Sequence, residues 1–291
     1  MKEPLPELII DLPLRRHIDA LAGSFVLVED AERAAIAGDI TKPLSGYSAW
    51  INVCEAISTS IHSRGYIVIR GLEADEGRSL LILGTSLGGI FQSYAPGRIV
   101  KRFRMSPWTE ELSHTIRAGD FHTDGNVSET PPSGTAMQCE REDPGAPEYA
   151  EQRVAYLPDL LDRLASGTRE DTAAFKFLTE NDAAMAHERS SSIWKGRLVQ
   201  NGTIRYHPHS LRIARKRLAD EEGKVDAAIA AVHRAAIDVS LPFHTSAGDT
   251  VLVSNRTALH YRGACSVRFT NFPLEFDSRS LFVLHMKDEN A

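Results

Sequence analysis

The sequence predicts an α+β protein built around an antiparallel β-sandwich or barrel. Helical patterns come early in the chain, β-type patterns occupy its middle and its end, and a further helical region separates the two β-rich parts. Runs of helices and runs of strands, rather than a regular alternation, are typical of such architectures. The 291 residues contain no repeat and no long linker, so we expect one domain over 1–291.

The first predicted elements are a helix over 46–63 and a strand over 65–71. The strand is a short β-branched and aromatic run between two glycines. The apolar residues of the helix recur at helical spacing and form one stripe, made of Trp50, Val53, Cys54, Ile57 and Ile61. A second helix is expected over 80–87, ended by Gly88 and Gly89.

The rest of the chain is predicted in the same way. Between 96 and 140, short β-prone pieces alternate with turn residues, which indicates strands and loops. The last strands flank the end of a helical insertion over about 150–240 and follow a turn at 247–249. The elements expected here are helices over 170–186 and 222–239, and strands over 250–253 and 281–284.

Composition excludes several classes of protein. The 33 basic and 39 acidic residues give a net charge of -6, which opposes binding to nucleic acid. No apolar run approaches the roughly 20 residues of a membrane span, and no signal-like stretch opens the chain, so we expect a cytoplasmic protein without a membrane partner. The three cysteines, Cys54, Cys139 and Cys265, lack paired spacing and are expected to be buried free thiols.

The sequence His-x-Asp occurs twice, and its context separates the two copies. His17 and Asp19 lie in a charged segment without a strand pattern, which favours a solvated histidine. His122 and Asp124 lie in a strand-like region, where side chains two apart share a face. His260 follows the strand predicted over 250–253 and is a third possible ligand. Two histidines and one carboxylate suit Fe(II) with open positions better than zinc.

These motifs resemble one enzyme family. The runs FHTDG at 121–125, PP at 131–132 and GDTVLVSNRTALHYRG at 248–263 are similar to the taurine dioxygenase (TauD/TfdA) and clavaminate synthase-like family of Fe(II)/2-oxoglutarate-dependent oxygenases. The similarity extends more loosely over about 65–286. The resemblance implies a double-stranded β-helix (jelly-roll) core with flanking helices. It also implies that His122, Asp124 and His260 bind Fe(II) and form the catalytic centre, with 2-oxoglutarate and O₂ as co-substrates.

The resemblance further implies an arginine that holds the distal carboxylate of 2-oxoglutarate. Arg279 is favoured because it opens the last predicted strand, from which a guanidinium can enter the barrel. Arg268, in a loop-like stretch, is the alternative. Relatives often carry a threonine that also contacts 2-oxoglutarate, whereas the matching stretch here, over 144–148, contains none. That hydrogen bond is absent or comes from elsewhere in the chain.

Other polar residues are weaker candidates for a substrate pocket. His207 and His209 flank Pro208, which favours a loop in the segment 205–209. An ordinary polar environment without a substrate role remains the alternative for all of these candidates. The basic cluster over 212–217 is expected to be a solvated helix face. The substrate-side candidates are His114, Arg205, His207 and His209.

The resemblance predicts hydroxylation or desaturation of an unactivated C–H bond in a small molecule, with release of succinate and CO₂. An amino acid or an amino-acid-derived natural product is the favoured substrate class. Related halogenases carry glycine or alanine at the carboxylate position, so Asp124 favours hydroxylation over halogenation. The alternatives are a catabolic dioxygenase of a small sulfonate or carboxylate, and a jelly-roll protein that binds metal without catalysis. A homo-oligomer is compatible with the sequence.

Overall fold

A large sheet organises the molecule. The computed structural model describes residues 4–85, 90–218 and 224–287, and within them the sheet has the strand order β1-β2-β11-β5-β15-β3, with β4 also paired to β15. All pairs are antiparallel except β1 with β2, which confirms the predicted α+β class. The strands are β1 (Glu7–Ile9), β2 (Tyr66–Arg70), β3 (Ile90–Phe91), β4 (Val100–Arg104), β5 (Gly134–Arg141), β11 (Thr250–Ser254) and β15 (Ser280–Lys287).

A second, two-stranded sheet faces the large one. It pairs β6 (Gln152–Tyr156) with β12 (Ala258–Arg262) in antiparallel register. Alternation along the strands of the large sheet divides the core into two layers. Tyr66 and Val68 of β2 pack with Val154 of β6, whereas Ile67 and Ile69 pack with the helices on the opposite face.

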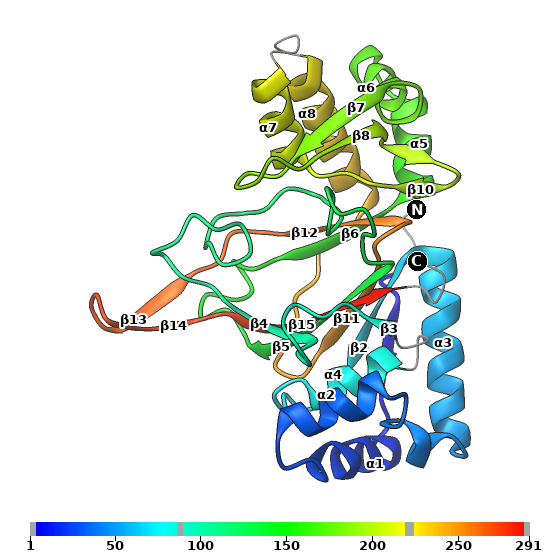
Figure 1. The fold of residues 1–291 in the computed structure, drawn as a ribbon, viewed down its shortest axis with the longest axis vertical. Helices are drawn as coiled ribbons and strands as arrows, with labels where there is room; N and C mark the ends of the chain where they lie inside the picture. Colours follow the sequence, from blue (N-terminus) through cyan, green and yellow to red (C-terminus); the bar gives the residue numbers. More distant parts are fainter. Residues whose placement is uncertain (1–3, 86–89, 219–223, 288–291) are drawn as a thin grey trace.

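Helices α1 to α4 cover that opposite face (Figure 1). They are α1 (Leu12–Gly23), α2 (Val28–Ile36), α3 (Ser48–Arg64) and α4 (Arg78–Thr85), with a short 3-10 helix at Lys42–Leu44. The predicted stripe of α3 is confirmed by the burial of Trp50, Val53 and Ile57. The predicted helix end at Gly88 and Gly89 lies outside the described residues.

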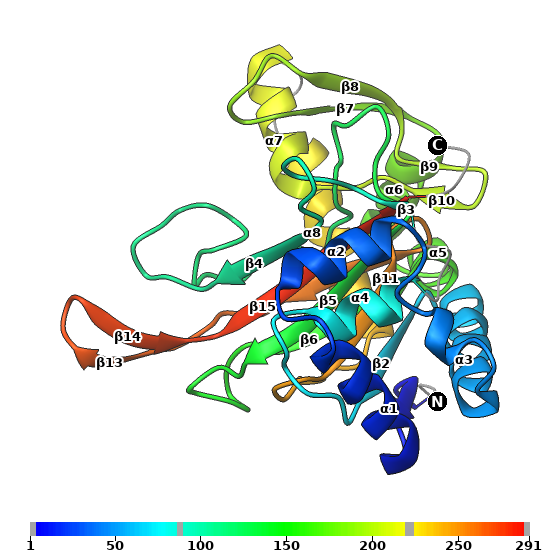
Figure 2. The same ribbon diagram turned by 60° about the horizontal axis from the view of Figure 1, so that its bottom comes forward.

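A second group of helices lies beyond the small sheet (Figure 1), and Figure 2 shows the β7–β8 pair beside one of them, α7. It contains α5 (Leu157–Ala165), α6 (Arg169–Thr179), α7 (Pro208–Leu218) and α8 (Lys224–Val239). Four short strands accompany these helices: β7 (Asp182–Ala186), β8 (Ile193–Arg197), β9 (Val199–Gln200) and β10 (Thr203–Ile204). The expected helical insertion over about 150–240 is therefore mixed, and its first strand, β6, belongs to the core.

Two predictions in this region require correction. The helix expected over 170–186 ends at Thr179, because the following alanine-rich residues pair with β8 and bury Met185 instead. Pro208 does not lie in a loop but is the first residue of α7. Proline is tolerated there because the N–H groups of the first helical turn have no partner within the helix. For the helix expected over 222–239, the described part, from Lys224, is helical, whereas residues 222 and 223 lie outside the described residues.

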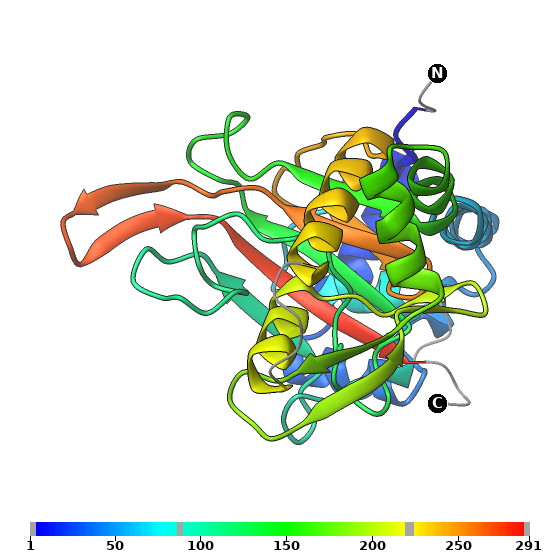
Figure 3. The ribbon, with the colours of Figure 1, turned by 90° about the horizontal axis from the view of Figure 1, so that it is seen from above.

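The turn before β11 requires a glycine. Gly248 has a φ of +90°, and a Cβ there would lie 2.0 Å from the carbonyl oxygen of Leu72. Only glycine fits this turn before β11. Strands β13 (Val267–Asn271) and β14 (Glu275–Ser278) form a hairpin that extends away from the rest of the molecule (Figure 3). Arg268 therefore lies in a strand, not in the expected loop.

Two expectations about the chain as a whole can be compared with the structure. No helix among the described residues is long and apolar enough to cross a membrane. Cys54, Cys139 and Cys265 form no disulfide bond; Cys139 and Cys265 are buried as expected, whereas Cys54 is only partly buried.

Candidate metal centre

Backbone pairing brings the three predicted ligands together. His122 and Asp124 lie in an extended segment outside the named strands, and His260 lies in β12. The segment joins β12 through two hydrogen bonds, from the His122 N–H to the His260 carbonyl (3.0 Å) and from the His260 N–H to the His122 carbonyl (3.1 Å). Thr123, between the two side chains, is buried and accepts a hydrogen bond from the Tyr206 N–H through its hydroxyl. Its neighbours therefore both project into the space between the two sheets.

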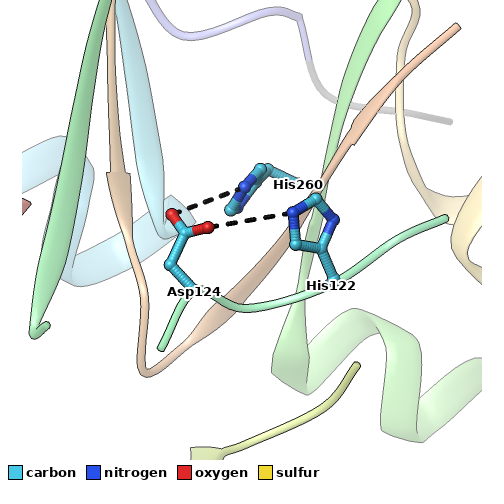
Figure 4. Close-up of side chains that lie close together, drawn as sticks. All are labelled: His122, Asp124 and His260. Atoms are coloured by element: carbon cyan, nitrogen blue, oxygen red, sulfur yellow. Dashed lines mark ion pairs between the residues drawn. The ribbon is translucent and has the colours of Figure 1, made fainter. Parts of the chain in front are cut away.

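The side-chain geometry fits one metal ion. Nε2 of His122 lies 3.8 Å from Oδ1 of Asp124, and Nε2 of His260 lies 3.7 Å from Oδ2 (Figure 4). One ligand atom from each residue lies within 4.8 Å of the others. Ligands that are each about 2.1 Å from a shared ion can be separated by up to about 4.2 Å, so the two distances from Asp124 to the histidines are of the size that a bound ion requires.

Electrostatics hold Asp124 and His260 in the protonation states that metal binding needs. Burial opposes ionisation of Asp124, but the imidazoles of His260, His285 and His122 outweigh it and keep the pKa of Asp124 well below its usual value. Burial, with the nearby His122, lowers the pKa of His260 to about 4. At neutral pH the site therefore offers a carboxylate and a neutral imidazole. Nδ1 of His122 is hydrogen-bonded at 2.7 Å to the carbonyl of Asp120, which orients its ring.

A cavity of about 630 Å³ opens from the three ligands. It lies between the two sheets and continues toward α7, with walls from β5, β6, β12 and β15. His207 and His209, two of the substrate-side candidates, line the cavity, and the His207 ring meets His122 edge to face with centroids 5.3 Å apart. Burial, followed by the nearby His122, lowers the pKa of His207 to about 3, so the His207 ring is uncharged at neutral pH.

Arg279 supplies a buried cation to the same cavity. It is only 2% exposed, and its Nη2 atom donates to Oγ1 of Thr245 at 3.3 Å. Its Nη1 atom has no hydrogen-bond partner, and no carboxylate of the described residues forms an ion pair with it. A buried guanidinium without an anion is costly. The side chain therefore fits a ligand that brings its own carboxylate.

Thr245 places a threonine hydroxyl beside Arg279, although the stretch 144–148 contains no threonine. Its hydroxyl also accepts a hydrogen bond from Nε2 of Gln152 at 2.8 Å, and all three residues are buried. Gln152 and Arg279 both line the cavity. Hydrogen-bonding groups beside Arg279 thus come from β6 and from the loop before β11.

Three candidates from the sequence are not brought to the cavity. Arg268 is on the surface of the β13–β14 hairpin, 70% exposed and paired with Asp277. His114 contacts the carbonyl of Arg104 and packs edge-on against Phe103. Arg205 stacks over Trp194 and donates to the carbonyl of Ser128. Each of these side chains is occupied by its own neighbours.

Sequence reasoning missed two features of the cavity. His285 lines it from β15, with Nε2 at 3.4 Å from Oδ2 of Asp124. Since Arg279 was expected to point inward, the two-residue period of a strand could have placed His285 on the same face. Arg212, expected on a solvated helix face, also lines the cavity and pairs with Asp120 at 3.1 Å. The helical register of α7 was the missing information.

Two imidazoles and a carboxylate converge at one point of a cavity walled by two sheets, and this set of groups matches the ligand set of mononuclear metal sites of the two-His, one-carboxylate class. Residues 46–268 match the family described as taurine catabolism dioxygenase TauD, TfdA family. The match spans most of the chain, and the protein belongs to this family. The resemblance found in the sequence motifs is thereby confirmed. No curated protein matches the chain.

Solved structures share the fold at low sequence identity. An asparagine oxygenase in complex with Fe(II), 2S,3S-3-hydroxyasparagine and succinate has a TM-score of 0.72 and 16% identity, covering 97% of this chain and 93% of that one. The non-haem iron oxygenase OrfP in complex with Fe and α-ketoglutaric acid has a TM-score of 0.68 and 14% identity, covering 97% and 94%. A variant of OrfP bound to (3S)-hydroxy-L-Arg has a TM-score of 0.71 and 14% identity, with the same coverage.

Proposed function

We propose that the protein is a non-haem Fe(II)/2-oxoglutarate-dependent dioxygenase that hydroxylates an unactivated C–H bond of an amino acid or an amino-acid-derived molecule. Family membership supports the reaction class. The observation that carries the proposal is that a possible metal site and a buried arginine without an anion share one cavity. The site offers both anchors that an iron-bound keto acid needs.

His122, Asp124 and His260 would hold the iron, and Arg279 would bind the distal carboxylate of 2-oxoglutarate. When bound, the iron would supply the oxidising chemistry by which 2-oxoglutarate, O₂ and the substrate R–H give succinate, CO₂ and R–OH. The protein's own part is to present the deprotonated carboxylate of Asp124 and the neutral imidazole of His260, and to exclude water by burial. Thr245 and Gln152 orient the guanidinium of Arg279.

An amino acid fits the charged wall of the cavity. Arg212 and Asp120 form an ion pair there that remains more than a third exposed on both sides. A zwitterion can replace each partner, its carboxylate meeting Arg212 and its ammonium group meeting Asp120. Amino-acid products in the structurally similar asparagine oxygenase and OrfP support the same substrate class.

We further infer that the two facing sheets form a double-stranded β-helix within a single domain. The antiparallel strand pairing and the burial of alternating residues between the sheets support this description. Helices α5 to α8 would then be an elaboration of that domain, and α7 lines the cavity.

Turnover with a panel of L-amino acids tests the function. Protein supplied with Fe(II), 2-oxoglutarate and air should form succinate together with an amino acid that has gained one oxygen atom. His260→Ala should abolish both products, whereas His17→Ala, on the surface of α1, should leave them unchanged. Succinate formed only with sulfonates or simple carboxylates would favour the catabolic alternative. Metal binding without any succinate would favour the non-catalytic one.

A further inference from the structure

Asp124 is held by two side chains that belong to neighbouring strands of the large sheet. The hydroxyl of Thr135 donates to Oδ2 of Asp124 at 2.7 Å, and Nε2 of His285 lies 3.4 Å from the same oxygen. Thr135 and His285 are directly opposite each other in the β5–β15 register. We call this cross-strand pair the carboxylate clamp. It spans two adjacent strands that pair along most of their length.

The main chain of Asp124 is fixed as well. Asn255, at the end of β11, accepts from the Asp124 N–H at 2.6 Å and donates to the Asp124 carbonyl at 3.0 Å. The same amide donates to the carbonyl of Pro132, and the Asn255 side chain is buried. Because Asp124 lies outside the named strands, these contacts fix the position from which its carboxylate reaches the clamp.

The clamp treats the two carboxylate oxygens differently. The hydrogen bond from Thr135 and the contact with His285 both reach Oδ2, and none of the hydrogen bonds found among the described residues reaches Oδ1. Each oxygen also faces one imidazole: Oδ1 lies 3.8 Å from Nε2 of His122, and Oδ2 lies 3.7 Å from Nε2 of His260. An oxygen that already accepts hydrogen bonds is a poorer metal ligand, so the carboxylate is biased toward binding through the other one. A carboxylate bound through both oxygens would fill one more position on the ion. A keto acid and O₂ need three open positions on an octahedral ion.

We propose that Thr135 and His285 are positioning residues that make Asp124 bind the metal through a single oxygen and so keep the co-substrate positions open. This inference rests on the proposed metal site. Neither residue contacts the metal in this account. Both act through the orientation and the hydrogen bonding of the carboxylate, and their loss should change metal affinity and coordination before it changes folding.

Matched substitutions at Thr135 test the clamp without activity measurements. Thr135→Val keeps the shape and the strand preference but removes the hydroxyl, and Thr135→Ser keeps the hydroxyl. Co(II) is the probe, since its visible absorption depends on its coordination. Thr135→Val should weaken Co(II) binding about 10- to 100-fold and alter the spectrum, while Thr135→Ser should resemble the wild type. Thermal unfolding without metal checks that both variants fold.

His285 provides an independent pair of variants. His285→Leu removes the N–H donor and should repeat the loss, whereas His285→Gln retains a donor at similar reach and should recover most of the affinity. Wild-type Co(II) affinity and spectrum in folded Thr135→Val or His285→Leu would overturn the clamp. Failure of the wild type itself to bind Co(II) would instead overturn the metal site on which the clamp depends.

Discussion

The two His-x-Asp segments of this chain have the same spacing but different backbone conformations. In both, the middle residue is buried: Ile18 is 0% exposed and Thr123 is 1% exposed. On helix α1 the flanking residues diverge, because two helical positions are separated by about 200°. His17 contacts the hydroxyl of Tyr47 at 2.7 Å, and Asp19 turns to Arg15. In the extended segment at 122–124, both flanking side chains lie on one face and enter the cavity.

The surroundings then give the two aspartates different chemistry. Burial and the carboxylate of Glu73 raise the pKa of Asp19, against the opposing effect of Arg15. Burial also acts on Asp124, but three imidazoles reverse its effect and lower the pKa. Backbone conformation and neighbouring charges therefore decide whether a His-x-Asp segment offers a metal site. Substitutions can test each of these two factors.

The largest contrast is expected from removing each aspartate. Asp124→Ala deletes a proposed ligand and should weaken Co(II) or Fe(II) binding by at least about 100-fold, the upper end of the loss typical of residues that merely support a ligand. Asp19→Ala is the matched control and should bind metal as the wild type does. Equilibrium metal titration measures both. Equal affinities in the two variants would remove the distinction between the segments.

Arg279 extends the comparison from the ligands to the co-substrate. Arg279→Met should raise the KM for 2-oxoglutarate at least about 30-fold, because a buried charge pair with the ligand carboxylate, worth about 2 kcal/mol or more, is lost. Arg268→Met, on the exposed hairpin, should leave that KM unchanged. Steady-state succinate formation measures the effect. A rise in KM confined to Arg268→Met would move the anchor to the hairpin.

Ile18 sharpens the comparison on the helical side. Ile18→Ala should lower the free energy of unfolding by about 2–5 kcal/mol, since it leaves a cavity where α1 packs on the core. Metal affinity of the folded variant should not change, because the core cluster around Ile18 does not include the ligands. Denaturant unfolding and metal titration of the same sample separate the two effects. A weakened metal site with unchanged stability would contradict this assignment.

The smallest effect is expected for Asp19→Asn. The raised pKa of Asp19 means that the folded protein favours the protonated carboxyl group. The stabilisation that this group gives the fold is therefore complete below the unfolded pKa of about 3.9 and is lost as the pH rises through the folded pKa. The variant should therefore match the wild type near pH 3 and be equal or slightly more stable at pH 7, by less than about 0.5 kcal/mol. The free energy of unfolding of both proteins, measured at the two pH values, tests the sign of this effect. A variant that is less stable than the wild type at pH 7 would contradict it.

Much of the fold and the proposed ligands followed from local patterns. The strand over 65–71 and the stripe of α3 were readable because their apolar residues recur at strand and helix spacing. Helices α1 and α5 were missed although Leu14, Ile18 and Ala22, or Leu157, Leu160 and Leu164, form equivalent stripes; charged neighbours and a short length obscured them. These misses did not affect the site, because both helices lie outside its ligand set.

The cavity wall was harder to predict because it depends on pairing between distant segments. The cross-strand contact of Thr135 with His285 needs the register of β5 and β15, which no local pattern contains. Arg212 reaches the cavity only because α7 lies beside the metal-ligand segment, where it meets Asp120. Sequence motifs could therefore nominate the metal ligands, whereas the residues that orient them required the tertiary structure.

Anaerobic absorption spectroscopy of the protein with Fe(II) and 2-oxoglutarate tests the central claim most directly. The account predicts a visible charge-transfer band that saturates at one Fe(II) per chain, requires 2-oxoglutarate and is absent from Asp124→Ala. No band in correctly folded wild-type protein, or an equal band in Asp124→Ala, would contradict the assignment of this cavity as an iron and keto-acid site.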